Sequence, residues 1–216
     1  MTIEISAFAW VPAFAQGYVK DLRPRWALEE AGLEYSVQLL SDDDRHADSY
    51  RAWQPFGQVP AYRDDTVQLF ESGAIVLHIA GRSEVLAPTS DQEAAQTQAW
   101  VFAGLNSIEP MVDNVVLPGV FHAGEPWIDG WRPHAEALLD GRLTSLSAWL
   151  SAREWLTGRF GVADIIMATV LRGLEDEPIL ARYPRLEAYR DRCLARPAFR
   201  RALQAQLDTY AANEPA

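Results

Sequence analysis

Residues 56–80, FGQVPAYRDDTVQLFESGAIVLHIA, constrain the fold more than any other part of the chain. Proline has no backbone N–H, so Pro60 is expected at the start or edge of a strand, with the peptide groups of Val59 facing outward. A cis Val59–Pro60 bond would cost only about 0.5–1 kcal/mol relative to trans and would turn the backbone sharply. This edge is therefore predicted to pair in antiparallel fashion with an extended peptide.

A second binding feature follows a turn at Asp64–Asp65, which is expected to close a hairpin between two short strands. A helix should then begin, with Ser72 as its N-cap. The free amides at a helix N-terminus suit a carboxylate, and the neighbouring Glu71 is placed to meet an ammonium group. Together these groups predict a site for the α-carbon end of an amino acid.

The Val-Pro pair followed about ten residues later by Glu-Ser resembles the soluble glutathione transferase family. The resemblance implies that Val59, held by Pro60, binds the cysteinyl backbone of glutathione through its main chain. It also implies that Glu71 and Ser72 hold the γ-glutamyl end, and that Gln58 lies near the glycyl side. Glutathione would then be the co-substrate.

The order of expected elements gives the same fold class. Residues 1–82 are expected to form strand, helix, strand, helix, strand, strand and helix, which resembles the α/β thioredoxin-like N-terminal domain of that family. Residues 83–90, SEVLAPTS, are expected to form a linker. Residues 91–216 are expected to form an all-α bundle that contributes the electrophile pocket and the dimer contacts. The resemblance is thinnest over residues 114–130.

Residues 156–171, LTGRFGVADIIMATVL, resemble the buried central helix of the family's second domain. Asp164 stands at position N3 of that helix, where the family returns a capping bond, whereas Gly161 replaces the usual capping hydroxyl. Glycine is only a few tenths of a kcal/mol worse than serine as an N-cap. We therefore predict a structural role for Asp164.

Charge and composition exclude several classes of protein. The net charge of −11 argues against nucleic acid or an anionic membrane as the main partner. No apolar run approaches the length that spans a bilayer, and no secretory signal pattern opens the chain, so a cytoplasmic location is expected. One cysteine and four histidines without ligand spacing predict neither an intrachain disulfide nor a metal site.

The group that activates the thiol is harder to place. The family usually carries a Tyr, Ser or Cys near the end of the first strand, but residues 7–26 here form a longer, atypical loop. Counting back from Trp26 puts Tyr18 at the expected position, whereas Pro24 favours a helix start near Asp21 that leaves Tyr18 in the loop. A packing role for Tyr18 and activation by the backbone amides of residues 14–17 are the alternatives.

Other side chains near this loop could also act on the thiol. Ser6 is a weaker candidate for activation because it lies inside a strand. Arg23 and Arg25 could stabilise the thiolate at range, although a solvated helix face is expected for at least one of them. Aromatic and polar side chains could line the pocket for the second substrate; the candidates are Trp10, Phe14, Phe102 and Asn106.

The sequence thus predicts a homodimeric glutathione transferase that adds the glutathione thiolate to a small apolar electrophile. A non-catalytic glutathione-binding or assembly module is the main alternative. A glutathione-dependent isomerase, peroxidase or ether-cleaving enzyme on the same scaffold stays open, because fold alone does not choose the reaction. A thiol-disulfide oxidoreductase is disfavoured, since Cys193 lies in the helical half without a CxxC partner.

Overall fold

The computed structural model describes residues 2–215. The chain divides into two compact units, of which unit 1 comprises Met1–Ala87 with Arg196–Ala216 and unit 2 comprises Pro88–Ala195. The first boundary falls inside the expected linker at residues 83–90. The end of the chain differs from the expected all-helical domain over residues 91–216, because the last helix packs on the helices of unit 1.

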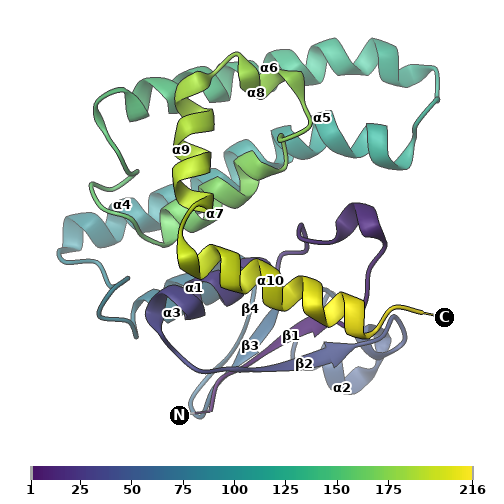
Figure 1. Cartoon of the computed structure of the whole chain (residues 1–216), viewed down its shortest axis with the longest axis vertical. Helices are drawn as coiled ribbons and strands as arrows, with labels where there is room; N and C mark the ends of the chain where they lie inside the picture. The colour runs from purple at the N-terminus through teal and green to yellow at the C-terminus, as the bar shows by residue number, and fades with distance from the viewer. Residues whose placement is uncertain (1, 216) are drawn as a thin grey trace. The chain divides into compact units, whose positions relative to one another are not determined.

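Unit 1 contains one four-stranded mixed sheet in the order β2-β1-β3-β4 (Figure 1). The strands are β1 (Glu4–Phe8), β2 (Ser36–Leu40), β3 (Ala61–Arg63) and β4 (Gln68–Phe70). β1 pairs with β2 in parallel and with β3 in antiparallel fashion, and β3 pairs with β4 in antiparallel fashion. The α/β thioredoxin-like topology is confirmed.

Helices accompany the sheet in unit 1, and the first of them packs against two others. Its helical segments are α1 (Leu22–Ala31), α2 (Asp48–Arg51), α3 (Ser72–Ala80) and α10 (Pro197–Ala212), with short 3-10 turns η1 (Ala13–Ala15) and η2 (Asp44–His46). α1 ends at Gly32, whose φ of 65° is left-handed, a conformation that glycine adopts without strain. α1 packs against both α3 and α10. Trp26 is fully buried and meets Phe199 edge-on at 4.8 Å between ring centroids.

Unit 2 is mainly helical. Its segments are α4 (Asp91–Phe102), a π-helical segment η3 (Ala103–Ile108), α5 (Glu109–Phe121), α6 (Trp127–Trp149), η4 (Leu150–Ala152), α7 (Val162–Arg172), α8 (Pro178–Ala181) and α9 (Pro184–Leu194). Across residues 2–215, no helix has both the length and the apolar character that crossing a membrane requires. Within the same residues, no cluster of three or more His, Cys, Asp or Glu side chains could hold a metal ion.

Asp164 organises the centre of unit 2. Its carboxylate is fully buried and accepts hydrogen bonds from the amides of Leu156 and Gly161, both at 3.0 Å, and from the Tyr189 hydroxyl at 2.7 Å. Burial raises the pKa of Asp164 to about 6, against the effect of these three donors. Gly161 is the N-cap of α7 and Asp164 its N3 residue. The structural role predicted for Asp164 is confirmed.

Candidate functional site

The peptide bond between Val59 and Pro60 is cis. Val59 directs its side chain into a buried cluster, and no residue from 2 to 215 hydrogen-bonds its backbone amide or carbonyl. The cluster consists of Leu40, Tyr50, Trp53, Val59 and Ala61, with Phe8 and Val19 packed against it. The side chain is thus fixed while the peptide groups remain available for an extended ligand, as expected from the proline.

The segment before Val59 is held by its own side chains. Gln54 is buried, and its Oε1 accepts hydrogen bonds from the amides of Phe56 at 2.7 Å and Gln58 at 3.2 Å. The Tyr50 hydroxyl donates to the Gln58 carbonyl at 2.6 Å. Gly57 has a φ of 64°, and a Cβ there would lie 2.7 Å from a backbone carbonyl, so only glycine fits. The Gln58 side chain remains exposed at the end of this rigid loop.

The second binding feature is the N-terminus of α3. Glu71 is its N-cap and Ser72 its first residue, so the prediction of Ser72 as the N-cap is wrong by one position. The cause is the backbone of Glu71, whose φ of 71° and ψ of 118° turn the chain before the helix. The exposed Glu71 side chain makes no capping bond, which leaves the first amides of α3 open. A non-glycine residue at this φ costs about 1–3 kcal/mol, and such residues gather at ligand sites.

Arg23 connects α1 to this helix start. It is 3% exposed, and its Nη1 donates to the Ser72 Oγ at 3.1 Å. Because the serine oxygen accepts this bond, the serine proton can be donated to a ligand acceptor such as a carboxylate. Arg25 is also buried, at 2% exposed, and its Nε lies 2.7 Å from the Asp21 carboxylate. The expectation of a solvated face for at least one of the two arginines is wrong, because α3 and α10 both cover α1.

Tyr18 lies in the loop before α1 and not in the helix itself. α1 begins at Leu22 with Asp21 at its N-cap, so Pro24 lies in the first turn and Tyr18 in the preceding turn, as Pro24 favoured. The Tyr18 side chain is 38% exposed, and its amide donates to Ala15 at 3.0 Å. Its neighbour Val19 packs on the cluster that contains Val59. The turn therefore lies beside the edge at Val59 that is predicted to bind a peptide.

Ser6 is not available to a thiol. It is fully buried in β1, where its Oγ accepts from the Ala61 amide at 2.7 Å and lies 2.8 Å from the Tyr50 hydroxyl. These bonds join β1 to the start of β3 and to Tyr50 of α2, whose hydroxyl donates to the Gln58 carbonyl. The ordinary strand role expected for Ser6 is confirmed.

The four pocket candidates lie in different surroundings. In unit 1, Phe14 lies in η1 with 58% of its surface exposed, and the buried Trp10 Nε1 has no hydrogen-bond partner within residues 2–215. In unit 2, Phe102 ends α4 with 57% exposed, and Asn106 is exposed in the π-helical segment. Their role in an electrophile pocket stays a prediction.

The π-helical segment around Asn106 has a physical cause. Pro110 lacks the N–H that would bond the carbonyl of residue 106 four positions earlier, and its ring crowds that carbonyl. The helix widens here instead of breaking. Gly104 allows the widened turn to approach α7, since a Cβ at this position would lie 2.8 Å from Ile166 Cγ2. Such π-helical turns are frequent at functional sites.

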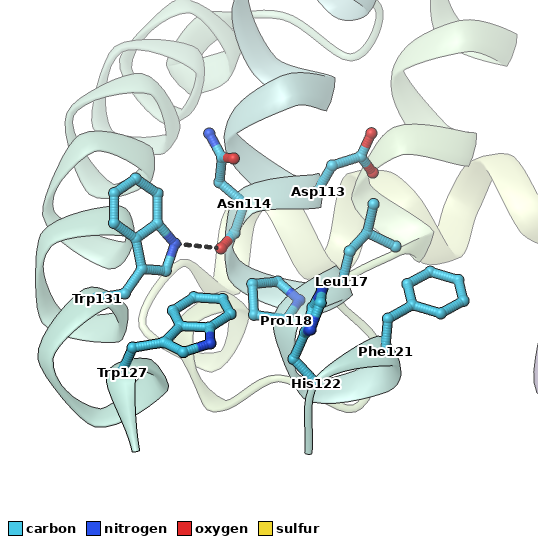
Figure 2. A pocket seen from close by; sticks show the side chains of 8 residues that line it. All are labelled: Asp113, Asn114, Leu117, Pro118, Phe121, His122, Trp127 and Trp131. Carbon is cyan, nitrogen blue, oxygen red and sulfur yellow. Dashed lines mark hydrogen bonds between the residues drawn. The ribbon is translucent and has the colours of Figure 1, made fainter. Parts of the chain in front are cut away.

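Unit 2 also has an open groove between α5 and α6 that the sequence did not predict (Figure 2). Its volume is about 510 Å³, and its lining is mostly apolar: Asp113, Asn114, Leu117, Pro118, Phe121, His122, Trp127 and Trp131. Pro118 cannot donate to the Asn114 carbonyl, and Trp131 Nε1 takes that place at 3.0 Å. The groove falls in the stretch where the family resemblance is thinnest.

The sequence is similar to those of known glutathione S-transferases. Residues 16–81 match the family model described as "Glutathione S-transferase, N-terminal domain". The chain is 30% identical over 188 residues to "Glutathione S-transferase GstA" of Escherichia coli O157:H7, with 83% of this chain and 90% of that protein covered. The chain belongs to the glutathione S-transferase family. A second glutathione S-transferase relative, "Glutathione S-transferase 4" of Zea mays, is 28% identical over 193 residues, with 82% and 84% of the two chains covered.

Solved glutathione transferases share the fold over almost the whole chain. A Pseudomonas putida structure with bound glutathione disulfide has a TM-score of 0.82 at 22% identity and covers 94% of this chain and 91% of that one. A Burkholderia graminis structure with two bound glutathione molecules per subunit has a TM-score of 0.82 at 24% identity and covers 94% and 88%. The glutathione S-transferase architecture predicted from the sequence is confirmed.

Sequence reasoning missed two contributions to the site. The sequence suggests a role for Arg23 at the thiolate and not at Ser72, because Arg23 and Ser72 lie 49 positions apart and no local pattern joins them. Gln206 is absent from the sequence-based prediction, although it lies on the buried face of α10 together with Phe199, Ala202 and Tyr210. A polar residue inside an otherwise apolar stripe is the signal that could have found it.

Proposed function

We propose that this glutathione S-transferase family member binds glutathione in unit 1 and adds its thiolate to a small apolar electrophile. One observation carries the proposal. Among residues 2–215, the peptide groups of Val59 have no hydrogen-bond partner, and the start of α3 at Ser72 has no side-chain cap. In the same unit, the Ser72 hydroxyl is held by the buried Arg23. Few ligands use both a peptide edge and a carboxylate site, and glutathione is one of them.

Each part of the tripeptide has a partner of matching chemistry. The Ser72 hydroxyl and the first α3 amides donate to the γ-glutamyl α-carboxylate, and Arg23 adds a positive charge behind them. Glu71 accepts from the ammonium group. The backbone of Val59 pairs with the cysteinyl residue, and Gln58 reaches the glycyl end. The ligand is thereby held at both ends with its sulfur between them.

The transfer step needs an ionised sulfur. A free thiol has a pKa of about 8.5, and lowering it by two units takes about 2.7 kcal/mol of preferential thiolate stabilisation. The Tyr18 hydroxyl, or the amides of residues 14–17, would supply those donors. The sulfur then forms a bond to the electrophilic carbon while the leaving group departs with the electron pair of its bond, and the thiol proton passes to solvent. Trp10, Phe14, Phe102 and Asn106 are proposed to line the pocket for this electrophile.

Replacing Tyr18 by phenylalanine tests the hydroxyl. We expect kcat with an aryl halide to fall about 10- to 100-fold near neutral pH, because one lost donor raises the thiol pKa by about one to two units. The KM for glutathione should change less than about threefold, because the tripeptide is held elsewhere. Tyr183→Phe, which removes a hydroxyl bonded to Asp140 in unit 2, is the control. An unchanged kcat in Tyr18→Phe would show that the Tyr18 hydroxyl does not activate the thiol, and it would favour the amides of residues 14–17 as the donors.

The non-catalytic alternative rests on the loop before α1. Tyr18 lies in a half-exposed turn ahead of the helix, a place from which a phenol is less firmly directed. Retention on immobilised glutathione without turnover of aryl halides, epoxides or peroxides would favour a binding or assembly module. Turnover of peroxides alone would indicate a peroxidase, and an isomerase or an ether-cleaving enzyme would be found only by adding its own substrate class to the panel.

Assembly as a homodimer is part of the proposal. Phe56 and Phe70 form an edge-to-face pair at 6.0 Å on the surface of unit 1, with 63% and 38% of their surfaces exposed. Two neighbouring exposed aromatic rings support a protein interface. We expect sedimentation to give twice the mass of one chain for the parent and a mass nearer one chain for Phe56→Ser. A monomeric parent, or an unchanged dimer in the variant, would remove this interface from the account.

We place the protein in the cytoplasm. Cys193 is buried and is the one cysteine in the sequence, so no intrachain disulfide can form. A reducing compartment suits this composition.

A further inference from the structure

We propose that Gln206 of α10 is a positioning residue that fixes the thiol-activating segment, residues 17–21, against the glutathione-binding edge. This inference rests on the proposed function and adds a control point on the last helix. The segment includes Tyr18 and borders the amides of residues 14–17. Whichever of these donors meets the sulfur, its position depends on how this turn is held.

The Gln206 side chain makes two contacts to the segment. It is fully buried, and its Nε2 lies 2.6 Å from the Asp21 Oδ1 and 3.3 Å from the Val19 carbonyl. One amide nitrogen therefore holds the backbone on one side of Lys20 and a carboxylate on the other. These contacts join positions 185 and 187 residues apart.

Asp21 is anchored from the other side by α1 itself. Its second oxygen, Oδ2, accepts from Arg25 Nε at 2.7 Å, and both side chains are buried. Asp21 stands at the N-cap of α1 but makes no side-chain cap bond, because its carboxylate faces the core. Burial is the main influence on the pKa of Asp21 and raises it, while Arg25 and Gln206 lower it. Loss of Gln206 would leave Oδ1 buried without its donor.

The held carbonyl lies next to the ligand edge. Val19 packs on the cluster that contains Val59, so a shift of Val19 moves the Tyr18 turn relative to the peptide groups that bind the cysteinyl residue. α10 is a firm support for this contact. Phe199 meets Trp26 at 4.8 Å, and Arg196 forms a bidentate ion pair with Glu30 at 2.6 and 2.8 Å.

Packing alone does not account for a glutamine at this place. Within residues 2–215, the Gln206 Oε1 is buried and has no hydrogen-bond partner. A buried unpaired carbonyl costs free energy that an apolar side chain of the same size would avoid. A glutamine stands here despite that cost, which assigns the role of Gln206 to its Nε2 contacts.

Gln206→Met removes both contacts at nearly constant side-chain volume, and Gln204→Met makes the same change at an exposed position of the same helix. We expect Gln206→Met to raise the pKa of the enzyme-bound glutathione thiol by about one unit, read from the ultraviolet absorbance of the thiolate. The kcat with an aryl halide at a pH below that pKa should then fall about tenfold. The KM for glutathione should stay within about threefold, and Gln204→Met should match the parent.

Hydrogen exchange tests the same inference without turnover. In the parent, the amides of Leu22 and Arg23, which donate to the Val19 and Lys20 carbonyls at 3.1 and 3.2 Å, should be protected. In Gln206→Met they should exchange at least about tenfold faster, while β1 and α3 keep the parent rates. Unprotected amides in the parent, or an unchanged bound-thiol pKa together with unchanged exchange in the variant, would overturn the role of Gln206. If the parent fails to bind glutathione but shows the expected exchange, the proposed function is contradicted. The role of Gln206 in holding residues 17–21 is then still supported.

Discussion

Replacing Ser72 by alanine is expected to weaken glutathione binding about 10- to 150-fold. The Ser72 hydroxyl accepts from Arg23 and is therefore oriented to donate to the γ-glutamyl carboxylate. A hydrogen bond to a charged group contributes about 1.5–3 kcal/mol, which corresponds to that range of affinity. Titration calorimetry of the variant and the parent gives the two dissociation constants directly.

The control for this experiment is Ser49→Ala, an exposed serine in α2 of the same unit. It should bind glutathione with the parent's affinity. If Ser72→Ala also binds within about twofold of the parent, the N-terminus of α3 does not hold the γ-glutamyl end, whatever the family resemblance implies.

The second large effect is on stability. Asp164→Ala is expected to lower the free energy of unfolding by about 3–5 kcal/mol, because it leaves two backbone amides and the Tyr189 hydroxyl buried without an acceptor. The measurement is urea unfolding followed by circular dichroism, at a pH more than one unit above the Asp164 pKa of about 6, where the carboxylate is ionised.

Asp129→Ala is the matched control in unit 2. Asp129 is exposed in the first turn of α6, so its loss should cost less than about 1 kcal/mol through the helix dipole. A loss of less than about 1 kcal/mol in Asp164→Ala as well would contradict the central structural role of the Asp164 carboxylate.

The features predicted correctly from the sequence are those that depend on residues close together in the chain. The turn residues Asp64 and Asp65 predicted the hairpin that joins β3 and β4, and Pro24 predicted that α1 begins near Asp21. The placement of Pro60 and the return bond of Asp164 likewise follow from residue types at short spacing. These features depend on a few neighbouring residues, so one sequence is enough to find them.

Contacts between distant positions were not predictable in this way. Arg23 and Arg25 read as a solvated helix face because nothing local shows that α3 and α10 cover α1. α10 itself was assigned to the helical domain by its place in the chain, although its apolar stripe packs on unit 1. The backbone turn at Glu71 moved the helix start by one residue, since a serine signal alone does not reveal a positive φ one position earlier.

The most direct test is a thermodynamic cycle that uses two ligands and two proteins. Calorimetry would compare glutathione with cysteinylglycine, which lacks the γ-glutamyl group, on the parent and on Ser72→Ala. We predict that the parent prefers glutathione by at least about tenfold and that Ser72→Ala loses most of this preference while its affinity for cysteinylglycine stays the same. Equal preference in both proteins, or no heat of binding with glutathione in the parent, would contradict the claim that Val59 and the α3 start hold the two parts of one tripeptide.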